Sequence, residues 1–330
     1  MMRSLTKKIR YGVVGKVRKI LSDFKLTLLT EPRYKSILSQ RSIAVRELVD
    51  QADIQFHDGL IGVVFSRDRA FQLDALLESY FEKVHNPANL IILYKATDLT
   101  HKKAYEEVIE RFCTQSPAIR YIEELGNFRD CLLRVLSSIR AKSIFFLVDD
   151  IVFINTVDLS IYSKVDSRSS ILSLRLSPHL KKSYATGRPQ SPPNLSPAAI
   201  SSELLEFKWF EQGCEWSDPW SVDGNIYSTA EINVLSRISQ FDAPNSYEDA
   251  LKSFADLAVD RIGYCFAQSK ILNLAINRVQ NEIKNQSGEI TPKFLLEQWN
   301  KGLKMDRRMF DSYTPISPHE EHVIQFRIRT

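Results

Sequence analysis

The sequence predicts an α/β fold in which a mostly parallel sheet is flanked by helices. From residue 60 onward, short apolar runs of strand length alternate with segments whose apolar residues recur at helical spacing. Such alternation is typical of a parallel sheet covered by helices. Polar residues also follow directly after several apolar runs, where parallel strands would end. A chain of 330 residues can bury a sizeable core, as one large domain or one domain with an appendage.

The first predicted strand and helix set the pattern. Residues 60–65 (LIGVVF) form a short apolar run, the polar turn 66–69 (SRDR) follows it, and apolar residues then recur at helical spacing over 71–80. The same reasoning predicts, in order, a strand at 89–94, a helix over 102–112, a strand at 119–122 and a helix over 128–139.

The most distinctive segment is 143–154 (SIFFLVDDIVFI), where Asp149 and Asp150 interrupt an otherwise apolar strand. A buried carboxylate without a partner is costly, so this pair needs a metal ion, a cationic ligand or a place where the chain leaves the sheet. Carboxylate oxygens suit Mg²⁺ or Mn²⁺, which often complete their shells with substrate phosphates. The alternative is that the two acids only start a turn and cap the next segment.

Polar residues at several strand ends are expected to meet, because ligands of open α/β sheets bind outside the carboxyl ends of the strands. We expect a nucleotide diphosphate to be bound there by Ser66, Arg67, Arg69, Lys95, Asp149 and Asp150. The 330 residues contain no Walker A sequence, and no G-x-G-x-x-G follows the first strand. A P-loop enzyme or a dehydrogenase is therefore disfavoured.

The second half of the sequence adds further candidate site residues. Residues 213–232 combine aromatic side chains with Asp223, and 241–251 contain Glu248 and Asp249, one of which is expected just before a helix. Arg175 stands between apolar neighbours, so it needs an anion, which could be a diphosphate or a buried carboxylate. Four aromatic residues could either wall a sugar site or belong to the core: Trp209, Trp216, Trp220 and Tyr227.

The order of these features resembles that of GT-A-type glycosyltransferases, including the large inverting family 2 and its bacterial members. Residues 61–80 (IGVVFSRDRAFQLDALLESY) resemble the opening strand, polar turn and helix of these enzymes. Residues 145–153 (FFLVDDIVF) resemble their acidic D-x-D strand. The resemblance covers about 59–280 and implies a GT-A-like nucleotide-diphospho-sugar transferase fold with a Rossmann-like, mostly parallel sheet.

The resemblance also implies ligands and roles. It implies a nucleotide-sugar donor and a glycan or lipid-linked acceptor. It also implies Mn²⁺ or Mg²⁺ held by Asp150 and Asp149, of which Asp150 is the main ligand and Asp149 lies nearer the ribose. The family motif usually carries an acid at its first position, where this chain has Val148. An inverting transfer needs a carboxylate to accept the proton of the acceptor hydroxyl. Glu248 is the first candidate for this base and Asp223 the second, while Arg175 joins the donor-binding set.

Composition and charge limit the other possibilities. The net charge of +4 is too small to indicate nucleic-acid binding, although residues 1–25 carry eight Lys or Arg against one acid. The spacing of the four cysteines indicates neither a zinc site nor a disulfide framework. Reduced thiols in the cytoplasm fit this spacing best. No apolar run is long enough to span a membrane. The basic segment 4–29 could lie on the inner face of the cell membrane as an amphipathic helix or pack on the main domain.

We expect three parts in the chain. Residues 1–57 form a basic, mostly helical extension, residues 58–285 the catalytic domain, and residues 286–330 a C-terminal helical appendage. Residues 180–197, rich in proline, are expected to cross the cleft as a mobile lid.

Two other functions remain open at this point. One is a nucleotidyltransferase on a related sheet, although the turn SRDRAFQ lacks the glycine-rich first loop typical of those enzymes. The other is a non-catalytic protein that keeps the fold and binds a nucleotide sugar or a glycan, which the missing first acid of the motif favours. The sequence favours a glycosyltransferase of polysaccharide biosynthesis over these two alternatives.

Overall fold

The computed structural model describes residues 31–53, 55–115, 118–277 and 290–329. The chain divides after Glu47 into two compact units. The described part of the first unit belongs to helix α2 (Glu31–Asp53), so residues 31–53 of the predicted extension are helical. The predicted segment 4–29 lies outside the described residues. The boundaries at 57/58 and 285/286 stay predictions.

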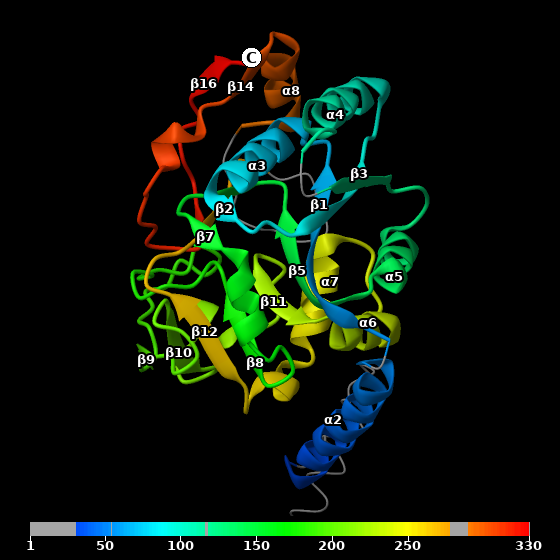
Figure 1. The fold of residues 1–330 in the computed structure, drawn as a ribbon, viewed down its shortest axis with the longest axis vertical. Helices are drawn as coiled ribbons and strands as arrows, with labels where there is room; N and C mark the ends of the chain where they lie inside the picture. Colours follow the sequence, from blue (N-terminus) through cyan, green and yellow to red (C-terminus); the bar gives the residue numbers. More distant parts are fainter. Residues whose placement is uncertain (1–30, 54, 116–117, 278–289, 330) are drawn as a thin grey trace, which may run out of the picture. The chain divides into compact units, whose positions relative to one another are not determined.

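The second unit is built on a nine-stranded sheet, and the α/β class predicted from the sequence is confirmed (Figure 1). Its strand order is β4-β3-β1-β5-β11-β8-β12-β10-β9. Strands β10 and β11 run opposite to the others, so the sheet is mostly parallel. The strands are β1 (His57–Arg67), β3 (Asn89–Lys95), β4 (Ile119–Glu123), β5 (Ala141–Val148), β8 (Ser170–Ser173), β9 (Ser196–Pro197), β10 (Leu204–Lys208), β11 (Asn225–Ser228) and β12 (Ile262–Phe266).

Helices cover both faces of this sheet. The chain moves outward from β1 to β3 and β4 and then returns to β5, so right-handed crossovers put α3 (Ala70–Lys83) and α4 (Leu99–Phe112) on one face and α5 (Phe128–Ser138) on the other. Figure 1 shows α3 beside α4 and α5 beside α6 (Thr229–Ile238), and both pairs are in contact. Helices α7 (Pro244–Lys252) and α8 (Pro292–Asn300) follow later in the chain.

Local sequence signals set several helix starts. The Asp98 carboxylate accepts hydrogen bonds from the backbone N–H groups of Thr100 and His101, so α4 begins at Leu99, three residues before the predicted start. The Asn127 side chain caps α5 in the same way. Asp68 adopts a positive φ of 55° in the turn before α3, and its carboxylate accepts hydrogen bonds from the backbone and side chain of Thr97.

The acidic segment differs from the single strand that the sequence suggested. It forms β5 and a second strand, β6 (Ile151–Phe153), with Asp149 and Asp150 in the turn between them. Strand β6 pairs with β13 (Ile271–Leu274), which pairs with β15 (His319–Glu320). The turn therefore lies where the large sheet meets a small three-stranded one, and this brings the C-terminal part of the chain next to the two acids.

Residues 290–329 contain strands as well as the predicted helix. Strands β14 (Leu303–Met305) and β16 (Phe326–Ile328) form an antiparallel pair. Glu78 on α3 binds one side chain from each of these strands, Lys304 at 3.0 Å and Arg327 at 2.9 Å. The remaining short elements are β2 (Val84–His85), β7 (Val157–Asp158) and the 3₁₀ helices η1 (Leu159–Lys164), η2 (Cys214–Ser217), η3 (Ala255–Ala258) and η4 (Arg307–Phe310). Among the described helices, none has the length and apolar character needed to cross a membrane.

Candidate functional site

One large cavity, of about 680 Å³, lies at the carboxyl ends of β1, β3 and β5. Nine candidate residues named from the sequence line it: Ser66, Arg67, Arg69, Lys95, Asp149, Asp150, Arg175, Asp223 and Glu248. Tyr184 and Ala185, from the predicted lid 180–197, line it too. The cavity brings these residues together, while their individual roles stay predictions.

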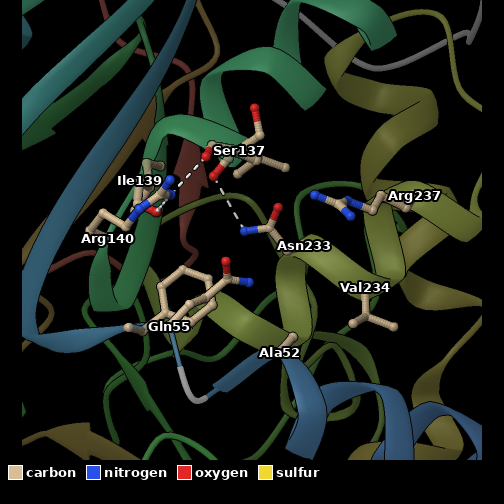
Figure 2. Close-up of a pocket in the computed structure, with 10 residues that line it drawn as sticks. Ala52, Gln55, Ser137, Ile139, Arg140, Asn233, Val234 and Arg237 are labelled. Carbon is tan, nitrogen blue, oxygen red and sulfur yellow. Dashed lines mark hydrogen bonds between the residues drawn. The ribbon is translucent and has the colours of Figure 1, made fainter.

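A much smaller cavity lies near the ends of α5 and α6 (Figure 2). Its volume of about 60 Å³ holds roughly two waters. Asn233 and Arg140 point into it, but Asn233 donates to the carbonyl oxygen of Leu136, and Arg140 to those of Ser137 and Ile139. These polar groups already donate hydrogen bonds to nearby backbone carbonyl oxygens, so we take the larger cavity as the candidate site.

Asp149 is fixed by the polypeptide. Its Oδ2 accepts hydrogen bonds from the Ser66 hydroxyl at 2.8 Å and from the backbone N–H of Arg67 at 3.2 Å. Its Oδ1 accepts one from Nη1 of Arg69 at 2.9 Å. Only 3% of the residue is exposed. Since the protein already engages both oxygens, Asp149 is suited to holding the turn between β5 and β6 in place.

Asp150 keeps an unused acceptor. Its Oδ2 pairs with Nη1 of Arg69 at 3.0 Å, whereas Oδ1 is buried and has no hydrogen-bond partner among the described residues. Burial raises the pKa of Asp150 to about 7; Arg69 opposes this rise, and Asp149 and Asp223 add to it. Asp150 lines the cavity, and a buried carboxylate oxygen without a protein partner is suited to a cation or a ligand hydroxyl.

Arg69 is the central cation of the turn. Its Nη1 donates to both Asp149 and Asp150, and its Nε donates to Oδ1 of Asn277 at 2.8 Å. Its Nη2 also donates to the backbone carbonyl oxygen of Asn277. Asn273, on β13, and Asn277 also line the cavity. Residues 278–289, which follow Asn277, lie outside the described part of the chain.

The anion that pairs with Arg175 is a buried carboxylate, one of the two anions that the sequence left open, while Nε of Arg175 has no hydrogen-bond partner among the described residues. Nη1 of Arg175 pairs with Oε2 of Glu215, and Nη2 donates to the carbonyl oxygen of Asp218 at 3.2 Å. Arg175 is 1% exposed and Glu215 7%. Sequence reasoning did not single out Glu215, because a lone acid in a short 3₁₀ helix carries no signal of burial. The four aromatic residues considered for a sugar site are buried in the core: Trp209, Trp216, Trp220 and Tyr227.

Glu248 lines the cavity from within α7, so the expectation that it stands just before a helix is wrong, because α7 already begins at Pro244. Its Oε1 accepts a hydrogen bond from the backbone N–H of Val222 at 3.3 Å, and its Oε2 lies 3.3 Å from Nζ of Lys252. Burial and the neighbouring Asp218 raise its pKa above the usual range, and Lys252 offsets part of this rise. A carboxyl group with a raised pKa is a stronger base once it is ionised.

Asp223 has a partner that the sequence did not predict. Oδ2 of Asp223 lies 2.8 Å from Nε2 of His319, on β15. Burial alone would raise the pKa of Asp223, but His319 lowers it, and in return Asp223 raises the pKa of His319 against its own burial. No local motif surrounds His319, and only the pairing of β15 with β13 brings it to the cavity.

The opposite end of the cavity lies at β3 and β4. Nζ of Lys95 donates to Oε1 of Glu124 at 2.7 Å, and both residues line the cavity. The apolar side chains Leu93, Phe65 and Phe128 line it beside them. The cavity therefore has three parts. Its apolar end contains the Lys95–Glu124 pair, its middle contains Arg67, Arg69, Asp149 and Asp150, and its acid-rich end contains Asp223 and Glu248.

The sequence is similar to that of a curated glycosyltransferase. No family model matches the chain. Over 197 residues it is 26% identical to the bifunctional glycosyltransferase pgtA of Dictyostelium discoideum, a match that covers 54% of this chain and 25% of pgtA. The chain thus spans about a quarter of the curated relative's length. This similarity supports a relation to glycosyltransferases.

Solved structures show weaker likeness. Residues 1–349 of S. aureus TarS in complex with UDP-GlcNAc align with 68% of this chain and 60% of that one, at 14% identity and a TM-score of 0.42. A 4-diphosphocytidyl-2C-methyl-D-erythritol synthase from Anaerococcus prevotii aligns with 74% of this chain and 96% of that one, at 9% identity and a TM-score of 0.37. At these scores neither structure decides the activity.

Proposed function

We propose that this protein is a GT-A-type glycosyltransferase, related to family 2, that moves a sugar from a nucleotide-activated donor to a hydroxyl group. One observation carries the proposal: a single cavity at the carboxyl ends of the parallel strands gathers cations, paired acids and a separate group of carboxylates. The sequence similarity to a curated glycosyltransferase supports the same reaction class.

The cationic middle of the cavity would bind the donor diphosphate. Arg67 lines the cavity, and its guanidinium has no ion pair among the described residues, so it is available to a phosphate oxygen. Arg69 holds the turn of acids through Nη1 and contributes positive charge at the same place. Ser66 and Asp149 orient this turn rather than bind the donor directly.

A divalent Mn²⁺ or Mg²⁺ ion fits this site only as part of a complex with the donor. Asp150 offers the buried, unpartnered Oδ1, but no group of three or more His, Cys, Asp or Glu side chains surrounds it within the described residues. A single carboxylate with phosphate oxygens and water is an ordinary Mg²⁺ environment. When bound, such an ion would neutralise charge that develops on the departing diphosphate.

The acid-rich end would receive the acceptor. We propose Glu248 as the base that takes the proton from the attacking hydroxyl, since its raised pKa favours proton transfer and its oxygens lie in the cavity. Asp223 is the second candidate, although its Oδ2 already pairs with Nε2 of His319. A single base and direct displacement would give inversion at the anomeric carbon.

The acceptor and the cellular setting are further parts of the proposal. A glycan or a lipid-linked sugar, used in polysaccharide biosynthesis, suits a cavity end that is lined by hydroxyl-binding carboxylates. A cytoplasmic location, with peripheral membrane contact through residues 1–29, stays a prediction because those residues lie outside the described part.

Donor binding and turnover test the proposal separately. The full chain is screened by thermal shift against UDP-, GDP-, dTDP- and CMP-sugars with and without Mn²⁺, because a ligand that binds only the folded state raises its stability. We expect a shift with one nucleotide class that Asp150→Asn weakens, and hydrolysis or transfer that Glu248→Gln lowers by about 100-fold.

The controls distinguish the alternatives. Glu203→Gln, at an exposed residue outside the cavity, should leave binding and turnover unchanged. Binding without turnover would favour a non-catalytic binding protein. A free nucleoside triphosphate as the preferred substrate would favour a nucleotidyltransferase, and no response to any donor would refute the proposal.

A further inference from the structure

The end of the cavity at β3 and β4 is built unlike the rest. The other end gathers carboxylates that pair with Arg175, Lys252 and His319 and suit hydroxyl groups. The middle holds Arg67 and Arg69. The β3–β4 end combines the apolar Leu93 and Phe128 with the Lys95–Glu124 pair. If the proposed function holds, the diphosphate lies in the middle, the sugar and acceptor at the acid-rich end, and the flat nucleobase at the remaining end.

The Lys95–Glu124 pair presents a fixed set of hydrogen-bonding groups to that base. The ammonium group has three donors, so it can donate to Glu124 Oε1 and to a ligand at the same time. Each carboxylate oxygen of Glu124 accepts more than one hydrogen bond. Among the described residues only Oε1 has a side-chain donor, which is Lys95. A base therefore meets one donor followed by two acceptors.

The Lys95–Glu124 pair differs from a neighbouring ion pair in its burial and in its place at the cavity. Lys102 and Glu123 also pair near the same sheet edge, at 3.1 Å, but neither lines the cavity, and their side chains are 43% and 27% exposed. The Glu124 side chain is 13% exposed. A surface pair needs no ligand, whereas the Lys95–Glu124 pair keeps a mostly buried carboxylate at an open cavity.

We infer that the Lys95–Glu124 pair selects guanine, and hence a GDP-sugar, as the donor. The Watson–Crick edge of guanine carries the acceptor O6 followed by the donors N1–H and N2–H₂. Lys95 donates to O6, and the two oxygens of Glu124 accept from N1–H and N2–H₂.

The other bases match this set less well. Uracil presents a carbonyl oxygen on each side of its single N–H, so one carbonyl faces a carboxylate oxygen. Adenine and cytosine can satisfy at most one donor and one acceptor of the pair, because each carries only one amino group on this edge. Guanine alone uses all three protein groups, and a bidentate contact of this kind also fixes its orientation.

Calorimetric titration of the full chain with nucleoside diphosphates tests the inference. GDP, UDP, ADP, CDP and inosine diphosphate are compared at one Mn²⁺ and one salt concentration. Inosine diphosphate differs from GDP only in lacking N2–H₂, so it probes a single contact to Glu124. We expect GDP to bind about 10- to 100-fold more tightly than UDP, ADP or CDP, and about 10-fold more tightly than inosine diphosphate.

Two matched variants locate the effect. Glu124→Gln replaces a carboxylate oxygen, which accepts hydrogen bonds, with an amide N–H₂ group, which donates them. This variant should therefore weaken the binding of GDP about 10-fold or more and remove the difference in affinity between GDP and inosine diphosphate. Glu123→Gln changes the adjacent, surface-paired acid and should preserve both the GDP affinity and that difference.

The outcomes separate this inference from the proposed function. Binding of UDP as tight as that of GDP, or a difference between GDP and inosine diphosphate that survives Glu124→Gln, would overturn the guanine assignment and leave glycosyl transfer standing. Binding of none of the diphosphates would overturn both. If Glu124→Gln does not fold, the affinities of the unmutated chain for the five nucleoside diphosphates still test the guanine assignment by themselves.

Discussion

Replacing Arg175 with methionine tests how much the buried ion pairs beneath the cavity contribute to stability. Methionine keeps most of the apolar volume but removes the guanidinium, which pairs with Glu215 and donates to the carbonyl oxygen of Asp218. Glu215 would keep only the hydroxyl of Ser183, at 3.1 Å, as a side-chain donor. Loss of one partner from a buried pair typically costs about 3–5 kcal/mol.

The pH dependence of this cost follows from the pKa of Glu215. Burial alone would raise that pKa, but Arg175 lowers it below the usual range. In the native protein the carboxylate therefore adds stability above its unfolded pKa and loses it as the pH falls through the lowered folded value. In Arg175→Met, burial acts without this opposition and raises the pKa, so the cost is largest at neutral pH and shrinks in acid.

Urea unfolding followed by tryptophan fluorescence measures the effect, because Trp216 is buried in the same 3₁₀ helix as Glu215. Arg175→Met together with Glu215→Gln leaves no unpaired charge and should recover most of the loss, to within about 1–2 kcal/mol of the native protein. The reasoning is refuted if Arg175→Met costs less than about 1 kcal/mol at neutral pH, or if Glu215→Gln restores nothing.

Three further predictions concern residues around the cavity. Gly224 has φ +74°, and a Cβ there would lie 2.4 Å from Cδ1 of Ile271, so Gly224→Ala should lower the free energy of unfolding by about 2–4 kcal/mol in urea titrations. Tyr105→Phe removes a buried hydroxyl that bonds to the turn before α3 at two points and should cost about 1–2 kcal/mol in the same assay. NMR titration should find the His319 pKa above its ordinary value and lower in Asp223→Asn. The stabilisation from this pair is then complete below the ordinary histidine pKa and disappears as the pH rises through the raised one.

The sequence alone determined the first strands and helices of the sheet and the edge that carries the cavity. The runs at 60–65, 89–94 and 119–122 became strands because local hydrophobic patterning depends only on neighbouring residues. Asp149 and Asp150 follow the core of an apolar strand, so their position at a strand end could be predicted without coordinates. Their split between β5 and β6 could not, because β6 exists through its pairing with β13.

The partners of the candidate residues were decided only by the tertiary structure. Arg69 meets Asp149 although 80 residues separate them, because β1 and β5 are neighbours in the sheet. Glu215 and His319 carry no local signal, and their places depend on how distant segments close against one another. A local sequence pattern shows which side chains are polar and where a strand ends. The order and register of the strands determine which charged group lies opposite each of these side chains.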